Sequence, residues 1–222
     1  MSAEAILPRR EATILLAAPI LLTLVHFHGQ SAAVEALLGP RYALYGWFAS
    51  TFLLLFAAPA LLVRLVLREP LSSFGLCLGQ PRVWAREAAL LGLILIPIAI
   101  AIARGTSLGA AYPVYRPVLT EPWLLVPSTL GWGVYFFAWE FFFRGFLLLG
   151  LKQRLGNLSL FIQLIPFVMA HYPKSELEAF AAVGGGLVFG VLALRGGSFL
   201  GAFCLHWALA TAINLAGMIS HG

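Results

Sequence analysis

The sequence predicts an all-α polytopic transmembrane bundle of about seven spans, forming a single membrane-embedded domain over residues 1–222. Of the 222 residues, 61% are apolar and 10% are charged, against about a quarter charged in an ordinary soluble domain. The mean hydropathy is +0.92. These values exclude a soluble globule, which would leave much of this apolar surface wet, and a disordered chain, which combines low hydrophobicity with high charge.

Apolar runs of near-spanning length, separated by charged or Gly/Pro-rich stretches, predict helices at 12–27, 43–66, 88–104, 122–150, 158–171, 177–194 and 198–219. A hydrocarbon core about 30 Å thick needs about 20 residues per span. The first and fifth helices are therefore short, and Pro166 in the fifth predicts a kink or a partial span. The fourth is long enough to tilt or to extend beyond the membrane.

The basic residues predict an orientation. With the N-terminus in the cytoplasm, the inside segments hold Arg9, Arg10, Arg64, Arg68, Arg82, Arg86, Lys152, Arg154 and Arg195. The outside segments hold only Arg41, Arg104, Arg116 and Lys174. This asymmetry follows the positive-inside rule, so we expect a multi-pass protein of the bacterial inner (cytoplasmic) membrane with a cytoplasmic N-terminus. The net charge of +5 is thus explained by the lipid bilayer, without a nucleic-acid partner.

Among the ionisable residues of the predicted spans, four are candidates for a functional site, because an ionisable residue in a span costs about 2.5–3.5 kcal/mol on insertion scales and needs a cause. Glu140 lies among apolar and aromatic residues of the fourth span, and Arg144 follows four residues later on the same helix face. An intramembrane ion pair that joins helices is the simplest interpretation of these two. His171 at the end of the fifth span and His206 inside the last indicate instead a shared interior site on three helices.

A glutamate and two histidines support two kinds of chemistry. Glu140, His171 and His206 are enough ligands for catalytic zinc or another divalent metal. Alternatively, Glu140 acts as base on a water that the histidines orient, which requires no cofactor. The sequence has no H-E-x-x-H helix, phosphate loop or dinucleotide fingerprint, so we expect no nucleotide partner.

The glycine-rich stretch of the sixth span has two interpretations. Gly186 and Gly190 form a small-xxx-small pair, which is typical of close helix packing. Gly184 and Gly185 equally suit a place where a substrate backbone approaches.

Three short motifs follow one another within about residues 120–220. The first runs from Trp139 to Gly145 (WEFFFRG), the second from Phe167 to His171 (FVMAH), and the third begins at His206. In order and separation they resemble the motifs E-E-x-x-x-R-G, F-x-x-x-H and H-x-x-x-N/D of the CPBP family (CAAX protease and bacteriocin-processing, or Abi) of intramembrane proteases. This segment is the expected protease-like core.

The resemblance implies peptide-bond hydrolysis within or beside the membrane by a glutamate- and histidine-activated water. It makes Glu140 the base, oriented by Arg144, while His171, His206 or Asn214 would stabilise the oxyanion. The implied substrates are membrane-anchored proteins or peptides cut near a terminus. In one bacterial branch, the myxosortases, the cleaved segment is a C-terminal sorting helix, and this compact chain is similar enough to suit that role.

Two positions depart from the family pattern. Trp139 stands at the first glutamate, which the family usually uses as the base, and Ala210 stands where the third motif has Asn or Asp. These departures leave two interpretations. In the first, which we favour because Glu140, Arg144, His171 and His206 all remain, Glu140 has taken over as the base of a variant site. In the alternative, the chain is a catalytically inactive CPBP-like membrane protein that acts as an immunity factor, scaffold or chaperone. A transporter is a third interpretation, but the inverted repeat typical of that class is not evident.

Overall fold

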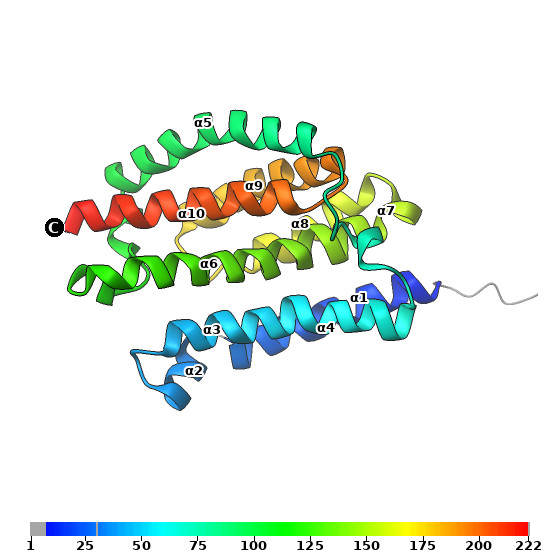
Figure 1. Cartoon of the computed structure of the whole chain (residues 1–222), viewed down its shortest axis with the longest axis horizontal. Coiled ribbons are helices and arrows are strands. Elements are labelled where there is room, and N and C mark those ends of the chain that lie inside the picture. The colour runs from blue at the N-terminus through cyan, green and yellow to red at the C-terminus, as the bar shows by residue number, and fades with distance from the viewer. Residues whose placement is uncertain (1–7, 30, 222) are drawn as a thin grey trace, which may run out of the picture.

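The computed structural model describes residues 8–29 and 31–221, and every regular element in these ranges is helical. The helices are α1 (Arg9–Leu24), α2 (Ser31–Leu38), α3 (Ala43–Phe52), α4 (Ala58–Leu61), α5 (Pro81–Gly105), α6 (Leu125–Glu140), α7 (Gly150–Leu155), α8 (Leu158–Met169), α9 (Glu176–Gly196) and α10 (Leu200–His221). Wider π-type turns connect α3 to α4 and α6 to α7, so each pair continues as one rod. The rods lie side by side as a bundle (Figure 1), which confirms the predicted all-α class.

Six helical segments in the described ranges are long and apolar enough to cross a membrane: Arg9–Gly29, Ala43–Leu67, Pro81–Gly105, Pro122–Leu155, Glu176–Gly196 and Leu200–Ile219. The predicted fifth span is the short α8, which has 12 residues and contains Pro166. The prediction of about seven spans therefore becomes six long helices and one partial span. The start of α1 and the end of α10 lie at opposite ends of the bundle (Figure 1), so α8 serves as the seventh traverse.

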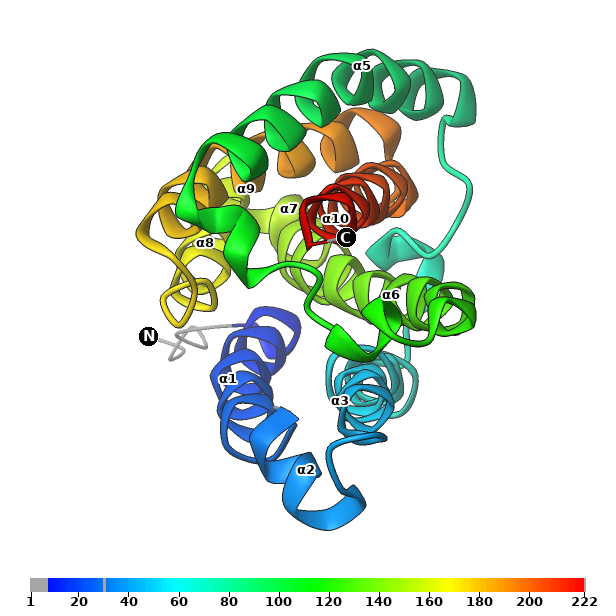
Figure 2. The same ribbon diagram turned by 90° about the vertical axis from the view of Figure 1, so that its left-hand side faces the viewer.

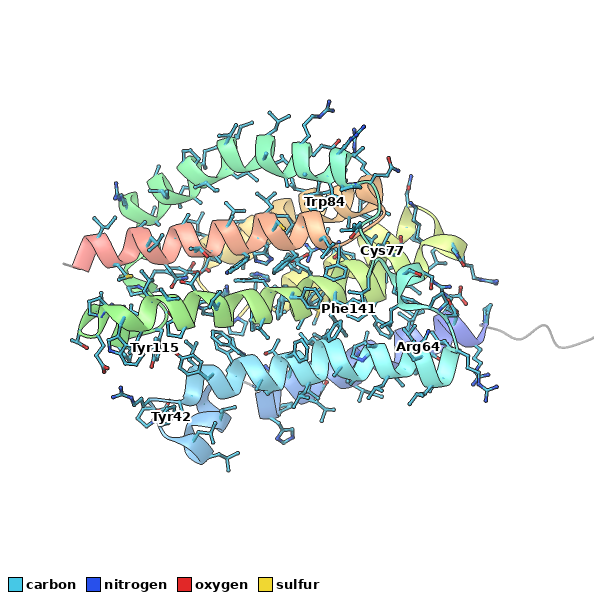
Figure 3. All side chains as sticks on the ribbon, viewed as in Figure 1. Tyr42, Arg64, Cys77, Trp84, Tyr115 and Phe141 are labelled. Atoms are coloured by element: carbon cyan, nitrogen blue, oxygen red, sulfur yellow. The ribbon has the colours of Figure 1, made fainter. Side chains whose placement is uncertain are left out.

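The rod that contains α6 is the core of the bundle. In its most apolar 18-residue window 89% of the residues are buried, against at most 33% in the other five long spans. Aromatic residues cover this helix on all sides, and a helix that is apolar all round is buried on all sides. Phe141 lies in the middle of the bundle (Figure 3), and Phe142, Phe143 and Phe146 are fully buried with it.

One end of the bundle is held by polar contacts of Arg10. At this end, Arg10 of α1 donates to Glu69 at 2.5 Å and to the carbonyl oxygen of Gly150 at 2.9 Å. Arg64 and Cys77 are seen at this end in Figure 3, and Tyr42 and Tyr115 at the other. We call the first end the basic end, because it holds Arg9, Arg10, Arg64 and Lys152. Each of the other basic residues lies at one end or the other according to the direction of its helix.

The close packing predicted at the sixth span is confirmed. A Cβ atom at Gly186 would collide with the side chain of Leu164, and one at Gly190 with the side chain of Leu160. The absence of side chains at these two positions lets α9 lie against α8. Seen along the bundle, α8 and α9 lie next to each other, on the same side of α10 (Figure 2).

Candidate active site

A fully buried ion pair lies at the junction of α6 and the turns that follow it. Both Glu140 and Arg144 have 0% of their side chains exposed, and the Arg144 Nε lies 3.1 Å from Oε2 of Glu140. The Nη1 of Arg144 donates to Oε1 of the same carboxylate at 3.2 Å. The guanidinium also lies over the ring of Phe167, 4.1 Å from its centroid. The i,i+4 pairing predicted for these residues is therefore formed inside the bundle.

His206 of α10 makes the second contact of this carboxylate. Its Nδ1 lies 2.6 Å from Oε1 of Glu140, and its ring lies between those of Phe136 and Phe189, with centroid distances of 4.3 and 4.9 Å. Because a carboxylate accepts hydrogen bonds, this partner assigns the imidazole proton to Nδ1. The Nε2 of His206 therefore carries the free lone pair.

His171, just beyond the end of α8, has the same tautomer for a different reason. Its Nδ1 lies 2.8 Å from the carbonyl oxygen of Phe167, which accepts the proton and leaves the lone pair on Nε2. Burial, and secondarily the positive charge of Lys174, lowers the pKa of His171 to about 4. His171 is thus a neutral hydrogen-bond acceptor at physiological pH.

A cavity of about 1470 Å³ extends from His171 and His206 towards the end of the bundle opposite the basic end. Side chains from α1, α5, α6, α8, α9 and α10 line it, and most of them are apolar. His171 and His206 are part of this lining, whereas Glu140 and Arg144 are not. A water beside Glu140 is expected from the sequence, but the carboxylate is buried behind His206, so the imidazole is the group that meets the cavity.

Asn214 lines the same cavity as His171 and His206, but its amide bonds to other groups. Its Oδ1 accepts from the backbone N–H of Val114 at 3.0 Å, and its Nδ2 donates to the carbonyl oxygen of Ala210 at 2.9 Å. Asn214 therefore holds the loop before α6 against α10. Ala210 lines the cavity one turn beyond His206 and offers no polar side-chain atom.

The three expected metal ligands do not converge. Within residues 8–29 and 31–221, no group of three His, Cys, Asp or Glu side chains is placed to hold a metal ion. In addition, Arg144 lies against both oxygens of Glu140, and its positive charge would repel a cation bound there. The residues present do not fit the zinc site that the sequence allowed.

A polar cluster at the cavity mouth was missed by the sequence analysis. Tyr112 donates to Oε1 of Glu178 at 2.7 Å, and Lys174 lies 3.4 Å from the same oxygen. Burial, with the nearby Glu178 carboxylate as the next cause, raises the pKa of Tyr112. Ser175 caps α9 by accepting from the N–H of Glu178, and its Ser-x-x-Glu pattern is a capping signal that the sequence carries. The partner Tyr112, 66 residues away, has no such signal.

Comparison with known proteins identifies the part of the chain that carries this site. Residues 121–212 match the family model described as type II CAAX prenyl endopeptidase Rce1-like. No curated protein and no solved structure matches the chain significantly. The matched segment contains the Glu140–Arg144 pair, His171 and His206, as the resemblance to the CPBP family predicts. Over residues 121–212, the chain is similar to the Rce1-like family of type II CAAX prenyl endopeptidases.

Proposed function

We propose that the protein is an intramembrane endopeptidase in which His206, supported by Glu140, activates a water molecule. The observation that carries this proposal is the 2.6 Å contact between Nδ1 of His206 and Glu140, made by an imidazole that lines the cavity. A buried carboxylate on Nδ1–H fixes the tautomer and stabilises the imidazolium that forms during proton transfer. Glu140 is therefore a positioning residue in this proposal, whereas the sequence analysis made it the base.

The reaction begins when Nε2 of His206 takes a proton from water. The water oxygen forms a bond to the scissile carbonyl carbon, and the carbonyl oxygen becomes an oxyanion. When this intermediate collapses, the C–N bond breaks and the His206 imidazolium returns its proton to the leaving amine. The products are a carboxylic acid and an amine, and His206 is neutral again. A general base of this kind typically contributes about 10²–10⁴-fold to the rate.

Two further groups support the water and the charge. His171, neutral and with Nε2 unprotonated, can accept the second proton of the water as a hydrogen bond and so orient it. Arg144 orients Glu140, because its guanidinium contacts both carboxylate oxygens. Neither group needs a metal to perform this role.

The proposed substrate is a membrane-anchored protein or peptide that is cut near a terminus. The largely apolar lining of the cavity suits an apolar segment, and removal of a C-terminal sorting helix, as in the myxosortase branch, is one such reaction. We place the protein in a bacterial inner membrane with its N-terminus in the cytoplasm. In that orientation the cavity mouth at Lys174 faces the outside.

A second candidate is a catalytically inactive relative that acts as an immunity factor, scaffold or chaperone. It is favoured by Trp139 and Ala210 at two positions where the family pattern has polar residues, and by the complete burial of Glu140. In this alternative the Glu140–Arg144–His206 contacts only join α6 to α10.

The experiment that separates the two compares membrane-protein termini in cells that carry the wild-type chain or His206→Asn. An asparagine amide can still donate to Glu140, but it has no basic nitrogen for the water. We expect uncleaved termini to accumulate with His206→Asn and not with His28→Asn, the same change at an exposed position away from the cavity. Identical termini at equal protein abundance would instead support the inactive alternative.

A further inference from the structure

Phe189 of α9 presents its ring to the imidazole of His206. The two ring centroids lie 4.9 Å apart and the ring planes meet at 29°, so the rings are stacked. Phe136 contacts the same imidazole at 4.3 Å, but its plane is tilted by 41°. Phe189 is buried, and it lines the cavity together with His206. The imidazole that meets the cavity therefore has the face of a buried aromatic ring against it.

The ring of Phe189 also contacts the cation of the buried pair. The Cζ of Arg144 lies 5.3 Å from the centroid of this ring, within the distance of about 6 Å over which a ring face attracts a cation. Phe189 belongs to α9, whereas Arg144 belongs to the turns after α6 and His206 to α10. One ring on a third helix thus contacts both of the nitrogen-bearing groups that bind Glu140.

The proposed reaction places a second positive charge at this carboxylate. Arg144 and His206 both contact Oε1 of Glu140, at 3.2 and 2.6 Å. When His206 accepts the proton of the water, one buried carboxylate faces two cations, and one positive charge has no counter-charge. Because an uncompensated charge is costly to bury, the transition state requires a further group that attracts a cation. An aromatic ring is such a group, since its face carries the negative part of its quadrupole.

We propose that Phe189 is a positioning residue that stabilises the imidazolium of His206 through a cation–π contact during proton transfer. This inference rests on the proposed endopeptidase function. As the proton moves from the water oxygen to Nε2, the O–H electron pair goes to the new C–O bond, and the positive charge that spreads over the imidazole is attracted to the ring face. The guanidinium of Arg144 is charged before and during the reaction, so its contact with the ring is the same in both states. Only the contact with His206 becomes stronger in the transition state, and only such contacts accelerate the chemical step.

The direct test replaces Phe189 by phenylalanine analogues whose ring carries one, two or three fluorine atoms. Fluorine withdraws electron density from the ring face and changes the shape of the ring little, so the attraction for a cation weakens while the packing is kept. We expect kcat on the peptide identified by the comparison of termini to fall with each added fluorine, by about tenfold with three, and KM to change less than about twofold. A tenfold change corresponds to about 1.4 kcal/mol. Cyclohexylalanine at this position, which keeps the bulk and has no aromatic face, should lower kcat at least as far.

The matched control is the same fluorine series at Phe199. This ring is also fully buried, and it packs edge-on against the rings of Phe137 and Phe141 at 5.2 and 5.5 Å. It lies outside the cavity lining. Fluorination at Phe199 should therefore leave kcat within about twofold of the wild-type value, whereas a general effect of fluorine on the fold would appear in both series.

The outcomes separate the two proposals. If the wild-type protein cleaves and His206→Asn does not, but the fluorine series at Phe189 leaves kcat within about twofold, the assignment of Phe189 is wrong and the endopeptidase stands. An equal loss of kcat in the series at Phe189 and at Phe199 contradicts the assignment in the same way. If His206→Asn leaves all termini unchanged, His206 is not the base, and both proposals fail together.

Discussion

Removal of either charge from the buried pair tests the electrostatic reasoning behind the site. Glu140 and Arg144 are both fully buried. Glu140→Gln therefore leaves a buried guanidinium without its counter-charge, and Arg144→Met leaves a buried carboxylate without its counter-charge. Breaking a buried pair from one side typically costs about 3–5 kcal/mol. With charge centres about 4 Å apart and an effective dielectric constant of about 20, the attraction itself is about 4 kcal/mol. The double variant should therefore cost about 4 kcal/mol less than the sum of the single variants.

The assay is reversible unfolding by SDS in mixed micelles, applied as a double-mutant cycle. Glu140→Gln keeps a side-chain oxygen that accepts from His206. The coupling energy of the cycle therefore reports mainly the charge–charge interaction with Arg144 and much less the hydrogen bond with His206. The matched control is the pair Arg195–Glu87, which is 2.7 Å apart but has an Arg195 side chain that is 61% exposed. Its coupling energy should lie below about 1 kcal/mol. If the two single costs at Glu140 and Arg144 add to within about 0.5 kcal/mol, the pair does not stabilise the site and the reasoning is refuted.

Three further predictions test the cavity, its histidine and the helix packing around it. The folded pKa of His171, about 4, lies below the ordinary value of about 6.5, so the unfolded chain binds a proton first. Stability should fall as the pH drops from about 6.5 towards about 4, and His171→Asn should lose this dependence when unfolding is measured at both limits. Gly184 lines the cavity and a side chain there meets open space, so Gly184→Leu should raise KM while Gly105→Leu, at another open position outside the lining, leaves it unchanged. Gly190→Leu should destabilise the bundle by about 1–3 kcal/mol or more, because the larger side chain overpacks against α8; an unchanged unfolding midpoint would contradict that contact.

The sequence is most informative where a property depends on composition or on spacing within one helix. Apolar runs are sufficient to predict the spans, and Pro166 signals the short fifth helix. The four-residue spacing of Glu140 and Arg144 is sufficient to predict their contact, since i and i+4 share a helix face. Gly186 and Gly190 likewise predict a close helix contact from their spacing alone.

Relations between helices are much harder to predict, because they depend on how each helix rotates about its own axis. The sequence places Glu140, His171 and His206 in three spans, but it does not state that His206 separates the carboxylate from the cavity. Nor does it indicate that Asn214 bonds to Val114, 100 residues earlier. Because of the first feature, the proposed function assigns the proton-accepting role to the imidazole of His206. Because of the second, Asn214 bonds to a backbone N–H although it lines the cavity.

The departure at Trp139 is informative because of what the neighbouring residues do. A second carboxylate at position 139 would place another acidic group next to Glu140, whose Oε1 already accepts from both Arg144 and His206. Tryptophan instead adds no charge and packs against Tyr135, Phe143 and His171. In the proposed function the base is His206 with Glu140, so the substitution at position 139 removes a carboxylate of the family pattern without removing the base.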